Sequence, residues 1–110
     1  MTKNLIKNKS FFNLLLATSE KQGLALLKSI TSDQISLLSE IAKNILRLPL
    51  PQKAKRLVNK KRKLFQSLAK KDTSKSKKTA AIRRNAAYIL MTLWSLREQF
   101  KDLQQLQYQQ

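Results

Sequence analysis

The chain has 110 residues, a net charge of +17, and neither Cys nor His. The lack of Cys excludes disulfides and thiolate metal sites, and the lack of His removes the commonest general base and metal ligand. The six acids are scattered along the chain with no pair placed for acid–base chemistry. We therefore expect no enzymatic activity, no cofactor and no metal site.

Hydrophobic periodicity and the scarcity of turn formers predict an all-α protein. One Gly and two Pro are too few for an all-β fold, and apolar residues recur at helical spacing. We expect a single helical domain, residues 1–110, built as a small bundle of four to five helices. The first three helices should cover about 4–18, 20–30 and 32–48, and residues 1–48 should form an apolar platform.

Short polar residues mark the starts of the second and third of these helices. Ser19 and Gln22 have the spacing of a capping box, in which each side chain bonds the backbone N–H of the other residue. Thr31 or Ser32 is expected to cap the third helix, with Asp33 in its first turn, where a negative charge is favourable.

A strongly basic helix is expected over residues 51–71, after the break made by Pro49. Its apolar side, which should pack on the platform, carries Leu57, Leu64 and Leu68. Lys61 falls on this apolar side, so we expect its aliphatic stem to follow the edge of the core while its charge reaches solvent.

The segment "DTSKSKK", residues 72–78, has no apolar residue and is expected to be a basic linker. Residues 79–110 should then form a long C-terminal helix with a Gln-rich tail. We expect its apolar stretch "AAYILMTLWSL", residues 86–96, to pack in the core or to form the seam of a homo-oligomer.

The positive charge lies in one block of the chain. Residues 47–84 hold fifteen Lys or Arg against the single acid Asp72, whereas residues 1–46 sum to +3 and residues 85–110 to zero. Because like charges one helical turn apart repel, a fold selected for stability alone would interleave acids among these cations. The block therefore indicates a polyanionic partner, either nucleic acid or an acidic protein.

The favoured function is non-enzymatic, largely sequence-neutral binding or condensing of DNA. Lys outnumbers Arg in the block, which favours neutralising phosphates over reading bases. No row of exposed aromatics suited to stacking on single-stranded RNA is evident, so DNA is favoured over RNA. The residues expected to bind nucleic acid are Lys53, Lys55, Arg56, Lys60, Lys61, Arg62, Lys63, Lys70, Lys71, Lys75, Lys77, Lys78, Arg83 and Arg84.

Three alternative functions stay open. A capsid-associated or scaffolding protein would use the same cations to bind an acidic partner. A membrane-active protein would insert "YILMTLW", residues 88–94, although no stretch has the length needed to span a bilayer and a membrane partner is not expected. A sequence-specific helix-turn-helix regulator fits least, because the rigid "LPLP" stands where such a motif has a short turn.

Two long segments carry a resemblance to a known family. They are "FFNLLLATSEKQGLALLKSITSDQISLLSEIAKNIL", residues 11–46, and "KSKKTAAIRRNAAYILMTL", residues 75–93, separated by the Pro-marked break and the Lys-rich helix. In their order and spacing the chain resembles small basic proteins of Maverick/Polinton-type DNA elements and adintovirus-like viruses. The resemblance has no catalytic signature and implies a virus-encoded protein of the virion or its DNA core.

The expected location is the nucleus of a host cell, the virion, or both. The runs "KAKR" at 53–56 and "KKRK" at 60–63 are typical of nuclear localisation signals. Near the N-terminus the apolar run "FFNLLLA", residues 11–17, is short for a signal peptide and lacks a convincing cleavage site, so secretion is not expected.

Overall fold

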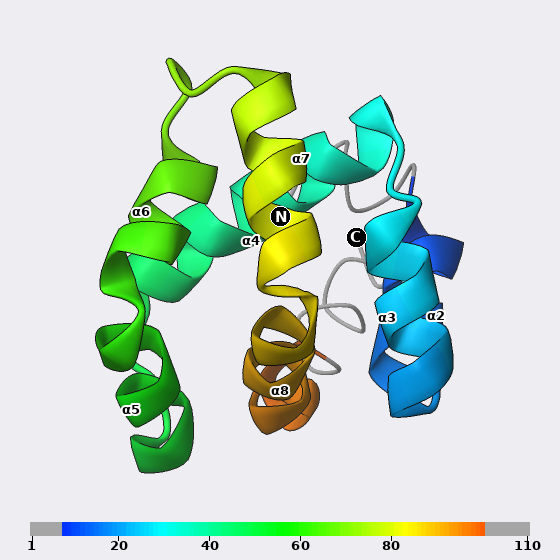
Figure 1. Ribbon diagram of the computed structural model, residues 1–110. Coiled ribbons are helices and arrows are strands. Elements are labelled where there is room, and N and C mark those ends of the chain that lie inside the picture. Colours follow the sequence, from blue (N-terminus) through cyan, green and yellow to red (C-terminus); the bar gives the residue numbers. More distant parts are fainter. Residues whose placement is uncertain (1–7, 101–110) are drawn as a thin grey trace, which may run out of the picture.

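Seven helices joined by short connections make up residues 8–100, which are the residues that the structure, a computed structural model, describes (Figure 1). They are α2 (Lys9–Ala17), α3 (Glu20–Lys28), α4 (Ser32–Arg47), α5 (Gln52–Lys60), α6 (Arg62–Ala69), α7 (Lys75–Arg84) and α8 (Ala86–Ser95). Residues 97–100 are helical again, and residues 8–100 contain no strand. The predicted all-α fold is therefore confirmed, whereas the predicted number of helices, four to five, is too low. The expected helix start near residue 4 and the Gln-rich tail, 101–110, lie outside the described residues.

The basic segment forms two helices where a single one over 51–71 was predicted. Lys61 separates α5 from α6 with φ −125° and ψ 44°, which lies outside the helical region. The apolar residues on either side still face the core, since Val58 and Phe65 are both buried. Hydrophobic periodicity therefore continues across the break and does not reveal it.

The connection after α6 is shorter than the predicted linker, 72–78. Ser74 caps α7 by accepting a hydrogen bond from the backbone N–H of Lys77 over 3.2 Å, so residues 75–78 are already helical. The predicted C-terminal helix also differs: it starts at Lys75 instead of near Thr79. It is interrupted at Asn85, where φ is −116° and ψ 24°.

The predicted caps in the first half are found at α3 and α4. Thr31 makes a complete capping box, because its hydroxyl accepts from the backbone N–H of Gln34 while its own N–H donates to the Gln34 side chain. Ser19 accepts from the N–H of Gln22, but the Gln22 side chain instead accepts from the hydroxyl of Thr18 over 2.6 Å. The box at Ser19 is therefore half formed.

The C-terminal helices lie inside the bundle. In Figure 1, α5 and α6 stand on one side, α2 and α3 on the other, and α7 and α8 between them, with α4 crossing behind. The contacts agree, since α8 packs on α2, α3 and α5, and α4 packs mainly on α6 and also on α7. The C-terminal segment thus completes the core from within.

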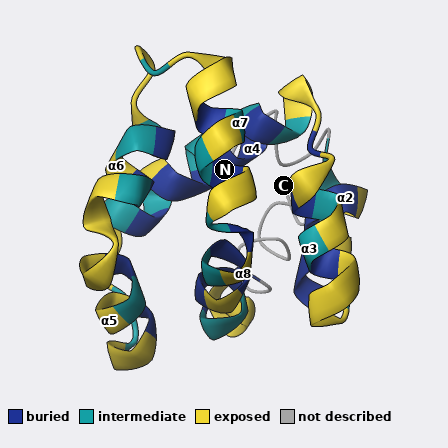
Figure 2. Cartoon of the chain, in the orientation of Figure 1, coloured by how far each residue is buried: buried dark blue, intermediate teal, exposed yellow. Residues whose placement is uncertain are grey.

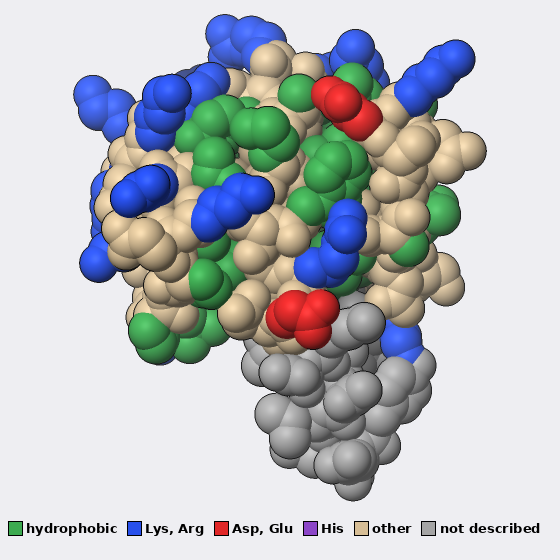
Figure 3. Space-filling model, turned by 90° about the horizontal axis from the view of Figure 1, so that it is seen from below, with side chains coloured by type: hydrophobic (Ala, Val, Ile, Leu, Met, Phe, Trp, Pro, Cys, Tyr) green, Lys and Arg blue, Asp and Glu red, His purple; other side chains and the backbone are tan. Residues whose placement is uncertain are grey.

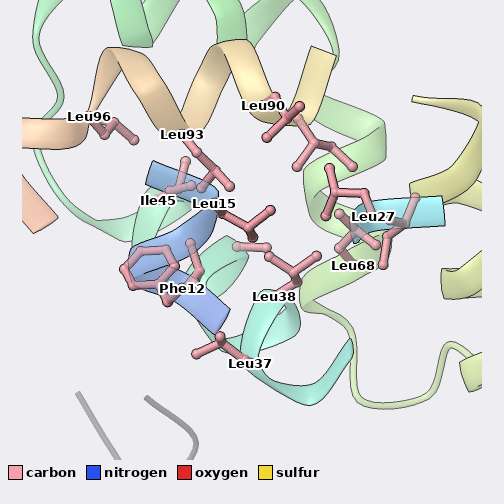
Figure 4. Close-up of a cluster of buried hydrophobic side chains, with 14 of the residues drawn as sticks. Phe12, Leu15, Leu27, Leu37, Leu38, Ile45, Leu68, Leu90, Leu93 and Leu96 are labelled. Atoms are coloured by element: carbon pink, nitrogen blue, oxygen red, sulfur yellow. The ribbon is translucent and has the colours of Figure 1, made fainter. Parts of the chain in front are cut away.

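One hydrophobic core joins all seven helices. Buried residues occupy the inward sides and exposed residues the outward sides (Figure 2). Phe12 and Leu15 of α2 meet Leu38 of α4 and Leu90 and Leu93 of α8 in the cluster drawn in Figure 4. The apolar stripe predicted for α4 is confirmed: Ile35, Leu38, Ile41, Ala42 and Ile45 are buried, and Leu46 is partly buried.

Candidate nucleic-acid interface

The predicted nucleic-acid-binding residues lie in four places. Lys53, Lys55, Arg56 and Lys60 are on α5; Lys61, Arg62 and Lys63 are at the α5–α6 break and the start of α6; Lys70 and Lys71 follow α6; and Lys75, Lys77, Lys78, Arg83 and Arg84 are on α7. Every one of these side chains is exposed except that of Lys78, which is buried. The predicted set is thus largely available to a partner but does not form one patch.

The α5 surface is the densest part of this set. Helical spacing aligns Lys53, Arg56 and Lys60 along one stripe, because residues three and four apart are neighbours. Arg62 bonds locally, with its Nη1 donating to the Asn59 Oδ1 over 3.1 Å. We use "α5 surface" for Lys53, Lys55, Arg56, Lys60, Arg62 and Lys63.

No residue of the α5 surface forms an ion pair with an acid in the described part of the chain. Figure 3, which views the molecule from below, shows Lys and Arg side chains spread over this face, many of them on the side where α5 stands in Figure 1, and few acidic side chains, which lie nearer the middle. α5 also lacks an acid in its first turn, although Glu20 and Asp33 occupy that position in α3 and α4. The charge of the α5 surface is therefore left uncompensated by the fold.

Among the predicted binding residues, Arg83 and Lys61 form side-chain hydrogen bonds with neighbouring helices. Arg83 donates from Nε to the backbone carbonyl of Lys28 over 2.9 Å, at the C-terminal end of α3, where a cation is favourable. Lys61 donates from Nζ to Asn85 Oδ1 over 2.9 Å, and its ammonium lies 5.0 Å from the centre of the Tyr88 ring. Both side chains therefore help to dock neighbouring helices.

A second cationic cluster forms where α7 crosses α4. Lys71, Lys75 and Lys78 meet Lys43 and Arg47 of α4 in one groove, which we call the α4–α7 groove. Lys43 and Arg47 were not predicted as site residues. The signal available in the sequence was their spacing: with Ser36 and Ser39 they recur every three or four residues along the polar side of α4.

Lys78 is the unusual member of this groove. Its side chain is 7% exposed, and its Nζ donates to the Ser39 hydroxyl over 2.9 Å. Burial lowers the pKa of Lys78 below its usual value, and the charges of Lys43 and Lys75 lower that pKa further. Because the Ser39 hydroxyl is neutral, it does not compensate the positive charge of the Lys78 ammonium.

The stretch expected to lie in the core or at an oligomer seam, 86–96, packs in the core of the chain. Leu90 and Leu93 are buried, and the two polar aromatic tips bond backbone carbonyls: Tyr88 Oη donates to Leu57 over 2.6 Å and Trp94 Nε1 to Leu15 over 2.9 Å. Burial also raises the pKa of Tyr88. The aromatic groups that a membrane wedge would expose are thus engaged within the fold.

Neither a membrane-spanning helix nor a metal-binding cluster is found among the described residues. No helix among residues 8–100 is long and apolar enough to cross a membrane. In the same residues, no three His, Cys, Asp or Glu side chains come together as a metal site would require.

Comparison with protein families, with curated proteins and with solved structures gives no match to this chain.

Proposed function

We propose that this protein binds duplex DNA without sequence preference, through phosphate contacts made by the α5 surface. The observation that supports this proposal is that the cations of the α5 surface are exposed and, among the described residues, have no acid partner. Lys and Arg placed along a helix neutralise successive phosphates and release the counterions condensed on the duplex. Such contacts supply affinity and carry little sequence information.

The repulsion within the α5 surface supports a partner of opposite charge. Lys53, Arg56 and Lys60 are neighbours on the helix, and like charges at this spacing cost a few tenths of a kcal/mol per pair. A phosphate backbone removes that cost on binding. The same argument fits a protein of a virion core, as the resemblance implies, or of the host nucleus, as the runs typical of nuclear localisation signals indicate.

The test is binding of a random 30-base-pair duplex across a salt series, measured by fluorescence anisotropy. With about six phosphate contacts, log K should fall against log salt with a slope of about −5. Changing Lys53, Arg56 and Lys60 together to Glu should lower the affinity and make the slope shallower by about 2 to 3, because three contacts are lost.

The matched control carries the same change in net charge on other exposed positions: Lys21, Lys28 and Arg97 to Glu. It should keep most of the slope of the natural chain. Equal losses in both variants would show that net charge alone attracts DNA. Absent binding near physiological salt would overturn the proposal and direct attention to an acidic protein partner, such as a capsid component.

A further inference from the structure

The α4–α7 groove is a separate cationic site with a defined shape. It has a volume of about 520 Å³ and lies between α4, the connection after α6 and the first turns of α7. Five cations from three segments line it: Lys43, Arg47, Lys71, Lys75 and Lys78. The groove therefore brings together cations that are up to 35 positions apart in the sequence.

The fold positions these cations without neutralising them. Lys78 is held by the Ser39 hydroxyl, and the Nζ of Lys75 donates to the Ser32 hydroxyl. Lys75, Lys77 and Lys78 also stand in the first turns of α7, where the helix dipole disfavours positive charge. The placement of these cations in the first turns of α7 costs free energy in the empty groove, and a bound anion would offset the cost.

Glu40 is the acid that lines the groove. Its Oε2 is buried and has no hydrogen-bond partner among the described residues, and the carboxylate forms no ion pair with the lysines there. One negative charge against five positive charges leaves the lining at +4. The chain's own acid therefore does not balance the groove.

The chemistry of the lining indicates the class of ligand. Besides the cations, Thr73 offers a hydroxyl and Asn44 an amide, which suit the oxygens of tetrahedral anions. A lining of +4 calls for several negative charges within one small volume, more than a single carboxylate or sulfate carries. We propose that the α4–α7 groove binds a compact polyphosphate anion.

The test uses inorganic tripolyphosphate as the probe, with sulfate at equal ionic strength as the comparison. Isothermal titration calorimetry should show one tripolyphosphate per chain, and the melting temperature should rise with tripolyphosphate concentration, since binding to the folded state stabilises it. Changing Lys43 and Arg47 to Gln should weaken tripolyphosphate binding at least tenfold. Both residues are exposed, so the variant should keep its helical circular dichroism spectrum.

The matched control is Arg56→Gln with Lys60→Gln, an exposed Arg–Lys pair at the same spacing on α5. It should bind tripolyphosphate as the natural chain does and bind DNA more weakly. Equal weakening in both double variants, or equal heat with sulfate, would overturn the proposal by showing non-specific attraction of anions. The two proposals fail independently, because they rest on different residues.

A final arm separates a free polyphosphate from the phosphates of nucleic acid. Random duplex DNA is added to the complex with tripolyphosphate. Simultaneous binding of both supports a separate small ligand. Stoichiometric release of tripolyphosphate by DNA, together with weaker DNA binding in the Lys43→Gln, Arg47→Gln variant, would overturn a separate ligand and make the groove part of the DNA-binding surface.

Discussion

Lys61 separates α5 from α6, Asn85 separates α7 from α8, and the two side chains are hydrogen-bonded to each other over 2.9 Å. Asn85 also donates from Nδ2 to the carbonyl of Ala81, which orients its Oδ1 for Lys61. The Lys61 ammonium lies over the Tyr88 ring, and the Tyr88 hydroxyl donates to Leu57 just before the first break. The α5–α6 and α7–α8 pairs are therefore joined where each bends.

This arrangement predicts that Lys60 and Lys61, adjacent in sequence, have different roles. Lys61→Ala should lower the free energy of unfolding by about 1 kcal/mol, because it removes a hydrogen bond and a cation–π contact at an exposed site. Lys60→Ala should change it by less than about 0.5 kcal/mol, as exposed substitutions usually do. Urea denaturation measures both values.

The two substitutions should affect DNA binding in the opposite order, with Lys60→Ala weakening it more than Lys61→Ala. Lys60→Ala is expected to reduce the salt slope by about 1, the share of one phosphate contact, whereas Lys61→Ala should change it less, since Lys61 is engaged with Asn85. If the two variants were equally stable and bound DNA equally, the Lys61–Asn85 contact would have no role in docking the helices.

The close packing of Gly23 in α3 against Leu90 in α8 predicts that substitutions at these two positions have coupled effects on stability. A Cβ at this position would lie 2.6 Å from Cδ1 of Leu90 and 3.3 Å from Cγ2 of Thr18, and Leu90 is fully buried. Gly23→Ala gains about 1 kcal/mol of helix propensity but overpacks the core at a cost of roughly 1–3 kcal/mol. We expect a net loss of about 1 kcal/mol in urea denaturation.

In a Leu90→Ala background the same substitution should instead stabilise the protein by up to about 1 kcal/mol, because the obstructing methyl groups are gone. Ala25→Gly, at an exposed position of the same helix, is the control and should cost about 1 kcal/mol in either background. The same value for Gly23→Ala in both backgrounds would mean that Leu90 moves aside without cost.

The limits of prediction from this sequence are set by contacts between distant residues. Apolar periodicity predicted α4 because this helix buries its own stripe, and the Ser19 cap predicted the start of α3. Apolar periodicity missed the break at Lys61 because neither Gly nor Pro marks it and Val58 and Phe65 face the core on both sides. The break is stabilised by Asn85, which lies 24 residues away.

Contacts between distant residues also explain why one cationic site could be predicted from the sequence and the other could not. The α5 surface could be predicted, since its residues lie close together in the sequence, on α5 and the start of α6, and their exposure follows from local pattern. The α4–α7 groove could not, because Lys43 and Arg47 meet Lys75 and Lys78 only when α7 packs across α4. Burial of Lys78 likewise depends on that crossing.

Lys78 provides a prediction on pH dependence. Its pKa is lowered in the folded chain by burial and by the charges of Lys43 and Lys75. Below that pKa, Lys78 is charged in both the folded and unfolded states, and the fold carries the full cost of burying the charge. As pH rises from the lowered pKa toward 10.5, the folded chain has released the proton while the unfolded chain still holds it. The contribution of Lys78 to stability therefore rises with pH through this window.

Lys78→Met, which keeps most of the side-chain length and removes the charge, should be more stable than the natural chain at neutral pH, and the difference should shrink as pH approaches 10.5. Urea denaturation of both proteins at several pH values measures it. Lys77→Met, at the exposed neighbour, is the control and should change stability less than Lys78→Met at neutral pH, because Lys77 is not buried. A loss of stability in Lys78→Met at neutral pH would show that the bond to Ser39 outweighs the cost of burying the charge.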